Sequence, residues 1–208
     1  MRVVAGVAGG RRLEAPPGRR LRPTTERVRE AVFSSLASLG VLDGAVVLDL
    51  FAGTGAMGIE ALSRGASSVT FVEADPGAVA VIRANLAATG LAGGTVAHAD
   101  VGRFLDRGPS PADLVFCDPP YAFTAWEALL ARLPGDLAVL ESRRAVEPGP
   151  GWEVVRTGRY GDTTVTTARR AGPTAAGPAA GPTGGTVDAG HDRMQQARRE
   201  QARRWQSP

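Results

Sequence analysis

From residue 46 onward, short apolar runs alternate with longer stretches of helical periodicity. The apolar runs lie at residues 46–48, 69–72, 95–96, 114–116 and 137–140. The helical stretches lie at residues 57–64, 76–89, 101–107 and 124–133. Because uninterrupted apolar runs are typical of strands buried on both faces, this alternation predicts an α/β fold with a mostly parallel sheet between two layers of helices.

The segments on either side of this alternation predict smaller elements. Residues 3–5 and 12–14 flank a glycine-rich turn and predict a β-hairpin, and a helix is expected from Glu26, capped by Thr24 or Thr25. Residues 152–159 and 163–170 predict a second hairpin. The interpretation has three parts: an N-terminal hairpin and helix at 1–40 that belong to the same domain, a core at 41–170, and a disordered Gly/Pro/Ala linker with a basic tail at 171–208.

Basic charge is concentrated at the N-terminus. Residues 1–30 contain eight arginines and three glutamates, although the whole chain carries a net charge of only +3. This arm predicts an anionic partner. A single cysteine, Cys117, and the lack of a signal peptide or a long apolar run favour a cytoplasmic protein with no membrane segment. His98 and His191 have no companion ligands in the sequence, so no metal site is expected.

A glycine loop follows the first apolar run. Gly53, Gly55 and Gly58 fit the pattern GxGxxG, and Glu73 lies where an acid often binds ribose hydroxyls. The pattern alone fits NAD, FAD or S-adenosylmethionine, or a tight turn without a ligand. Asp49 favours S-adenosylmethionine, because a carboxylate would repel a pyrophosphate and attract the ammonium of a methionine moiety.

Asp100, after the third apolar run, has two possible roles. Its carboxylate could accept a hydrogen bond from an adenine amine, or it could cap the next helix, and both roles could hold together.

The tetrapeptide Asp118-Pro119-Pro120-Tyr121 follows the fourth apolar run. Its prolines predict a rigid loop at the carboxyl end of a strand, where ligands bind in such sheets. The Asp118 carboxylate and the Pro119 carbonyl could each accept an N–H of an exocyclic base amine and direct its lone pair toward a methyl donor. Tyr121 offers a flat face for an extruded base. This chemistry indicates N-methylation of a nucleic-acid base.

Several stretches resemble the RsmD family of bacterial 16S ribosomal RNA guanine-N2 methyltransferases. They are RPTTERVRE at 22–30, VLDLFAGTG at 47–55, EALSRGA at 60–66, FVE at 71–73, DPPY at 118–121 and RYGDT at 159–163. The resemblance covers about residues 1–170. It implies a Rossmann-like class I methyltransferase fold with a seven-stranded sheet whose last strand is reversed. It also implies methylation of guanine 966 in the small ribosomal subunit or its assembly intermediate. A monomer is expected.

The candidate site residues fall into three groups. Catalysis is assigned to Asp118, Pro119, Pro120 and Tyr121. S-adenosylmethionine binding is assigned to Asp49, Phe51, Ala52, Gly53, Thr54, Gly55, Glu73, Ala74, Asp100 and Val101. RNA binding is assigned to Arg11, Arg12, Arg22, Thr24 and Arg27.

Other functions remain open at this point. The same motifs fit an N6-adenine methyltransferase acting on DNA or RNA. Methylation of a glutamine amide in a release factor is a further possibility, although such enzymes usually carry Asn where Asp118 stands. A non-catalytic RNA-binding module with the same fold is the third alternative.

Overall fold

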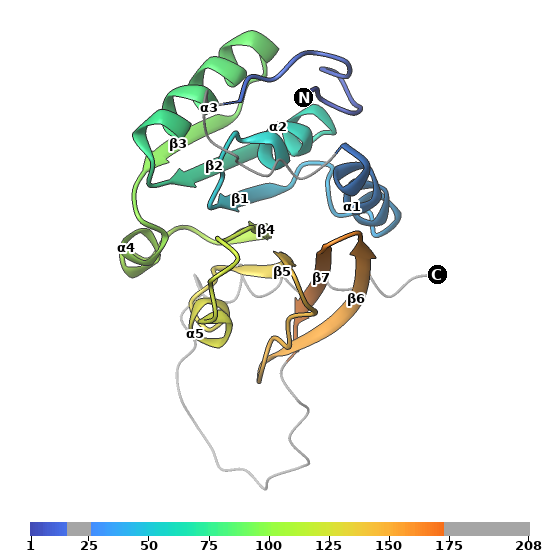
Figure 1. The fold of residues 1–208 in the computed structure, drawn as a ribbon, viewed down its shortest axis with the longest axis vertical. Helices are drawn as coiled ribbons and strands as arrows, with labels where there is room; N and C mark the ends of the chain where they lie inside the picture. The colour runs from blue at the N-terminus through green and yellow to red at the C-terminus, as the bar shows by residue number, and fades with distance from the viewer. Residues whose placement is uncertain (16–25, 173–208) are drawn as a thin grey trace, which may run out of the picture. The chain divides into compact units, whose positions relative to one another are not determined.

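The five apolar runs and the predicted hairpin at 152–159 and 163–170 form one seven-stranded sheet in the computed structural model, which describes residues 1–15 and 26–172 (Figure 1). The strands are β1 (Val46–Leu50), β2 (Ser68–Glu73), β3 (Gly94–His98), β4 (Ala112–Cys117), β5 (Gly135–Ser142), β6 (Trp152–Tyr160) and β7 (Thr163–Arg170). The helices are α1 (Glu26–Ser38), α2 (Ala56–Ser63), α3 (Pro76–Thr89), α4 (Val101–Asp106) and α5 (Trp126–Leu130).

The strand order is β3-β2-β1-β4-β5-β7-β6. Strands β1 to β5 are parallel to one another, and β7 is antiparallel to both β5 and β6. The direction of the chain therefore reverses only in β7. This arrangement confirms the predicted Rossmann-like sheet with a reversed last strand.

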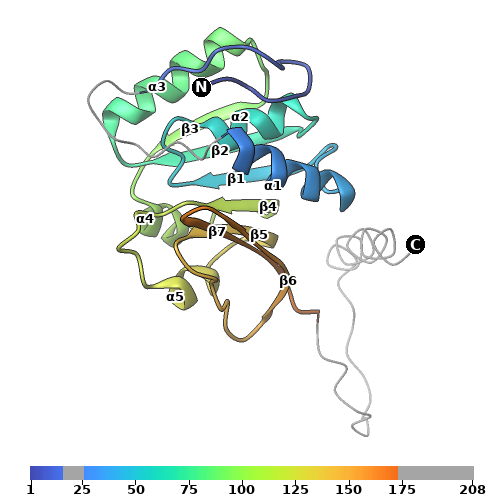
Figure 2. The same ribbon diagram turned by 45° about the vertical axis from the view of Figure 1, so that its right-hand side comes forward.

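Helices cover both faces of the sheet (Figures 1 and 2). On one face, side chains of α1, α2 and α3 pack with Phe71 and Phe116 in one buried cluster. On the other face, side chains of α4 and α5 pack with Leu50 and Leu140 in a second cluster. Adjacent residues of β1 point into opposite clusters, because Val47 belongs to the first and Leu48 to the second. Burial on both faces explains the uninterrupted apolar runs.

Local signals set several helix ends. The Asp75 side chain accepts a hydrogen bond from the amide of Ala78 at 2.9 Å, and Pro76 occupies the first turn of α3. Gly90 ends this helix with a φ of 61°. Helix α5 is shorter than the predicted 124–133 stretch. Its start is delayed because the Phe123 amide closes a turn onto the Pro120 carbonyl at 2.8 Å.

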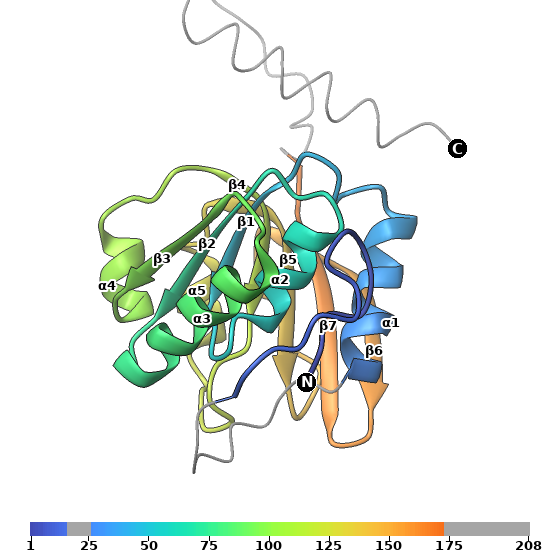
Figure 3. The same ribbon diagram turned by 90° about the horizontal axis from the view of Figure 1, so that it is seen from above.

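The N-terminal segment pairs with itself in antiparallel register, as the predicted hairpin requires, but without regular strands. Residues 1–15 form only one isolated antiparallel bridge, between Arg2 and Arg12, supported by a few backbone hydrogen bonds such as Val3 N–H to the Arg11 carbonyl at 2.9 Å. Positive φ angles at Gly6 and Gly10 bend the chain out of regular strand geometry. The segment runs along α2 and α3 (Figure 3).

Residues 1–172 form one compact unit. No helix among the described residues is long and apolar enough to span a membrane. The predicted cap at Thr24 or Thr25, and the predicted linker and tail from residue 173, lie outside the described residues.

Candidate active site

The two loops that carry the sequence motifs follow neighbouring strands. In the register of β1 and β4, Leu50 lies beside Cys117, so the glycine loop and the Asp118–Tyr121 loop begin side by side at the same edge of the sheet. Aromatic rings connect them: the ring centroids of Phe51 and Phe123 are 5.9 Å apart, and those of Phe123 and Trp126 are 5.2 Å apart. Both motif loops therefore lie at the carboxyl edge of the parallel strands.

The glycine loop has the left-handed backbone that its residue types indicate. Phe51, Gly53 and Gly55 have φ angles of 59°, 57° and 75°. A Cβ at Gly55 would lie 3.2 Å from the Ile82 side chain, whereas a Cβ at Gly53 would meet nothing closer than 3.9 Å. Gly55 thus packs closely against Ile82, and Gly53 leaves room on its open side for another molecule. The positive φ of Phe51 is uncommon for a residue with a side chain and marks local strain in this loop.

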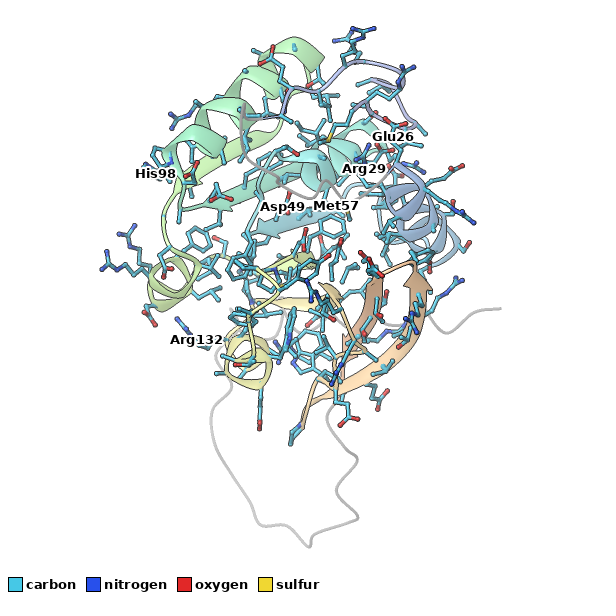
Figure 4. The ribbon with its side chains drawn as sticks, viewed as in Figure 1. Glu26, Arg29, Asp49, Met57, His98 and Arg132 are labelled. Atoms are coloured by element: carbon cyan, nitrogen blue, oxygen red, sulfur yellow. The ribbon has the colours of Figure 1, made fainter. Side chains whose placement is uncertain are left out.

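Asp49 is buried at the end of β1, 3% exposed, and its Oδ2 accepts a hydrogen bond from the Gly58 amide at 2.9 Å. Burial raises the pKa of Asp49 to about 7; the Gly58 amide opposes this rise, and the charge of Glu73 adds to it. In Figure 4, Asp49 lies beside Met57 near the middle of the molecule. The carboxylate therefore holds the first turn of α2 against the end of β1.

Glu73 joins the glycine loop to the end of β2. Its Oε2 accepts a hydrogen bond from the Gly53 amide and its Oε1 accepts one from the Asp75 amide, each at 2.8 Å. A carboxylate oxygen has a second lone pair, so these bonds leave acceptor capacity on Glu73. The side chain therefore fixes the glycine loop to the end of β2.

Asp100 caps α4, since its Oδ1 accepts a hydrogen bond from the Arg103 amide at 3.1 Å. This confirms one of its two predicted roles, and Val101 beside it is buried. Ala74 is exposed between β2 and α3, and its carbonyl lies 3.1 Å from the Nε2 of His98. The Ala52 amide donates to the Val72 carbonyl at 3.1 Å.

The residues of the Asp118–Tyr121 loop differ in their exposure to solvent. Pro119 is buried, Asp118 is half-buried, and Pro120 and Tyr121 are exposed. Cys117, just before the loop, is buried, and burial together with the charges of Asp49 and Asp118 raises the pKa of its thiol. The thiol stays protonated at neutral pH, so Cys117 is a small core residue rather than a nucleophile.

The N-terminal segment is held by buried polar side chains that sequence reasoning did not assign. Glu60 of α2, 0% exposed, accepts hydrogen bonds from the amides of Val4 at 2.7 Å and Ala5 at 3.0 Å and from the Arg64 side chain. Its place in the EALSRGA motif was the one signal that the sequence offered. This motif fastens the N-terminal segment to the helix that begins at the glycine loop.

Asn85 of α3 and Arg29 of α1 complete the attachment. Asn85 accepts a hydrogen bond from the Glu14 amide at 2.7 Å and donates to the carbonyls of Glu14 and Thr54 at 3.2 and 3.0 Å. Arg29 is fully buried and donates to the Arg2 carbonyl at 2.6 Å. Burial lowers the pKa of Arg29, although Glu60 and Glu26 favour its charge.

Three of the residues predicted to bind RNA lie among the described residues. The Arg11 guanidinium donates to the Ala88 and Thr89 carbonyls at the end of α3. Arg12 and Arg27 are exposed, on the N-terminal segment and at the start of α1. Arg22 and Thr24 lie outside the described residues.

A separate groove of about 440 Å³ lies on the α4 side of the sheet. Val46, Thr70, Ala97, Phe104 and Pro111 are among the residues that line it. No residue of the glycine loop or of the Asp118–Tyr121 loop lines this groove. Among the described residues, no group of three or more His, Cys, Asp or Glu side chains could hold a metal ion.

Comparison with known proteins finds relatives from different bacteria that carry the same name. The chain is 40% identical over 121 residues to ribosomal RNA small subunit methyltransferase D of Escherichia coli K12, a match that spans 58% of this chain and 60% of the relative. It is 34% identical over 137 residues to the protein of the same name from Haemophilus influenzae, covering 64% and 70% of the two chains. The chain thus spans three fifths of the Escherichia coli relative that it matches.

Among solved structures, yhhF of Escherichia coli superimposes with a TM-score of 0.73 at 33% identity, covering 82% of this chain and 97% of that one. The family model described as conserved hypothetical protein 95 matches residues 1–169. That range includes both motif loops and the N-terminal segment fastened to α2. The chain therefore belongs to the conserved hypothetical protein 95 family, the RsmD family that its motifs predict.

Proposed function

We propose that the chain transfers a methyl group from S-adenosylmethionine to the exocyclic N2 amine of a guanine in small-subunit ribosomal RNA, at guanine 966 of 16S rRNA. The observation that carries the proposal is the juxtaposition of the glycine loop with the Asp118–Tyr121 loop at the ends of adjacent strands. The names of the relatives support ribosomal RNA as the substrate.

The residues of the first loop fit an adenosine-bearing cation. The open side of Gly53 admits a ligand close to the backbone, and a buried carboxylate at Asp49 favours a positive group. Glu73 keeps acceptor capacity for ribose hydroxyls beside the Gly53 amide. When bound, S-adenosylmethionine supplies an electrophilic methyl group on a sulfonium.

The residues of the second loop orient the amine. The Asp118 carboxylate and the Pro119 carbonyl each accept one N–H, which turns the nitrogen lone pair toward the neighbouring loop. Tyr121, 38% exposed, packs against the target base. Methyl transfer discharges a cation, so Asp118 need not remove a proton before the new C–N bond forms, and the proton leaves the nitrogen afterwards.

The test compares methyl acceptors. The wild-type chain, with radiolabelled S-adenosylmethionine, is given unmodified 30S particles, naked 16S rRNA, DNA and release factor, and the labelled nucleotide is mapped. Label at N2 of guanine 966 supports the proposal. Label in adenine N6 or in a glutamine amide would replace it with one of the alternative methyltransferase functions.

The matched variants are Asp118→Ala and Asp118→Asn. Both should lower kcat by a factor of about 100 or more, because the pre-oriented acceptor is worth several kcal/mol in such sites. The affinity for S-adenosylhomocysteine should stay within a factor of about 3 of the wild-type value by calorimetry. Undiminished turnover in both variants would remove Asp118 from the mechanism.

A further inference from the structure

Three exposed arginines lie on the far side of the Asp118–Tyr121 loop from the glycine loop. Arg143 and Arg144 directly follow β5, whose last residue, Ser142, lies beside Thr164 of β7. Thr164 in turn lies beside Arg159 of β6. Because β7 is antiparallel to β5, the turn between β6 and β7 reaches the same edge of the sheet as the carboxyl end of β5 (Figure 3).

Arg143 contacts the proposed base-binding residue. Its Cζ atom lies 4.5 Å from the centroid of the Tyr121 ring, within the range of a cation–π interaction. The backbone beneath Arg143 is fixed, since the Thr164 hydroxyl donates to the Arg143 carbonyl at 3.3 Å. The Ser142 hydroxyl likewise donates to the Arg144 carbonyl. The first guanidinium after β5 is therefore held at the edge of the site.

The positive charges of these three arginines are not neutralised by ion pairs within the described fold. None of them forms an ion pair with a carboxylate among residues 1–15 and 26–172. Arg159 donates only to the Gly161 carbonyl of its own turn, at 3.3 Å. Asp162 is the exposed acid of that turn and offsets one of the three positive charges.

Neighbouring arginines differ in this respect. Arg156 of β6 donates to the Ser35 hydroxyl of α1 at 3.4 Å. Arg170 of β7 packs over Trp152 and donates to the Leu133 carbonyl at 2.7 Å. These two side chains join elements of the fold, whereas Arg143, Arg144 and Arg159 are exposed at the edge of the site, where an anion can reach them.

We propose that Arg143, Arg144 and Arg159 form a second RNA-binding surface, the β5–β6 rim, which binds phosphates next to the nucleotide held by the Asp118–Tyr121 loop. The rim and the N-terminal segment lie on opposite sides of that loop, since α2 and α3, which hold the segment, follow β1 and β2. The bound RNA strand thus runs along the edge of the sheet from the N-terminal segment, past the Asp118–Tyr121 loop, to the β5–β6 rim. This inference rests on the proposed function.

The phosphate assignment follows from the chemistry of the rim. A planar guanidinium donates two hydrogen bonds to a phosphate, and such contacts need no particular base. Binding to each phosphate releases counterions, so affinity should depend on salt concentration. The rim therefore positions the RNA strand, while the choice of base remains with the Asp118–Tyr121 loop.

The experiment measures binding of an unmodified 16S rRNA transcript to the full chain at several salt concentrations. The triple variant R143A/R144A/R159A should flatten the plot of log affinity against log salt by about 0.7 to 0.9 for each phosphate that the variant no longer binds. The triple lysine variant R143K/R144K/R159K retains the charges and should restore most of the slope. The control is Arg107→Ala, an exposed arginine after α4 at the opposite edge, which should leave the slope unchanged.

Two further readouts separate the possible failures. The triple alanine variant should bind S-adenosylhomocysteine as the wild type does and should raise KM for the transcript more than it lowers kcat. If the wild type binds the transcript and the triple alanine variant shows the same slope as Arg107→Ala, the rim assignment is wrong while the methyltransferase proposal stands. If the wild type binds neither the transcript nor unmodified 30S particles, both proposals fail.

Discussion

The buried carboxylate of Asp49 should make cofactor affinity depend on pH. Its pKa is raised to about 7, chiefly by burial, from an ordinary value of 3.8. An ammonium group close to Asp49 favours the ionised form, so binding of S-adenosylhomocysteine should release a proton below pH 7. The ionised fraction is about 0.1 at pH 6 and about 0.9 at pH 8, so the dissociation constant should fall about tenfold between these two values.

The direction of this change tests the orientation of the ligand. If the carboxylate of the ligand faced Asp49 instead, ionisation would oppose binding and affinity would fall as the pH rises. Asp49→Asn is the matched variant, because its amide oxygen still accepts the Gly58 hydrogen bond. It should bind S-adenosylhomocysteine with little pH dependence and, at pH 8, about 10- to 100-fold more weakly through loss of a charged hydrogen bond.

The assay is calorimetry at pH 6, 7 and 8 in buffers of different ionisation enthalpy, which counts the protons released on binding. About 0.9 proton should leave at pH 6 and about 0.1 at pH 8 in the wild type, and almost none in Asp49→Asn. A wild-type dissociation constant that is equal at pH 6 and pH 8 would refute the assigned contact between Asp49 and the ammonium group.

Three other predictions concern stability. In the ligand-free chain the raised pKa of Asp49 means that the folded state binds the proton more tightly than the unfolded state, so the free energy of unfolding falls as the pH rises from 3.8 to about 7. By urea unfolding at pH 8, the free energy of unfolding of Asp49→Asn should therefore exceed that of the wild type by up to about 4 kcal/mol. Gly58→Ala places a Cβ 2.3 Å from a ring carbon of Phe71, and the unfolding free energy should fall by about 1–3 kcal/mol; an unchanged value would contradict the packing of α2 on β2. Gly6→Ala places a Cβ 1.8 Å from a backbone oxygen of α2 and should expose residues 1–15 to limited proteolysis, whereas Gly10→Ala, also at positive φ but with open space, should only lower the unfolding free energy by about 1–2 kcal/mol.

The parallel part of the sheet was predictable because each of its strands appears in the sequence as an unbroken apolar run. Val47 and Leu48 point to opposite sides and are both buried, so the apolar run is unbroken and its position is plain from the sequence. The N-terminal hairpin was less predictable. Gly6 and Gly10 bend the chain, and hydrogen bonds to α2 and α3 take the place of a regular ladder. Such long-range contacts leave no periodic pattern.

Burial of polar groups was also hidden from the sequence. Glu60 is an acid in a helical stretch, which is typical of a solvent-exposed face, yet it is fully buried because two amides more than 50 residues away need acceptors. Asn85 is buried for the same reason, between Glu14 and Thr54. Only the folded arrangement shows that these acceptors and donors meet.

The site motifs were visible because their residues meet two requirements at once. Glu73 must accept the Gly53 and Asp75 amides for the loop to form, and its position also suits a ribose-bearing ligand. Few other residue types would satisfy both requirements. Arg143 meets only one, since its side chain contacts Tyr121 from the surface and a lysine or glutamine would leave the fold intact. A residue that meets a single requirement leaves no motif in one sequence, so only strand register and contact geometry bring the three arginines of the β5–β6 rim together.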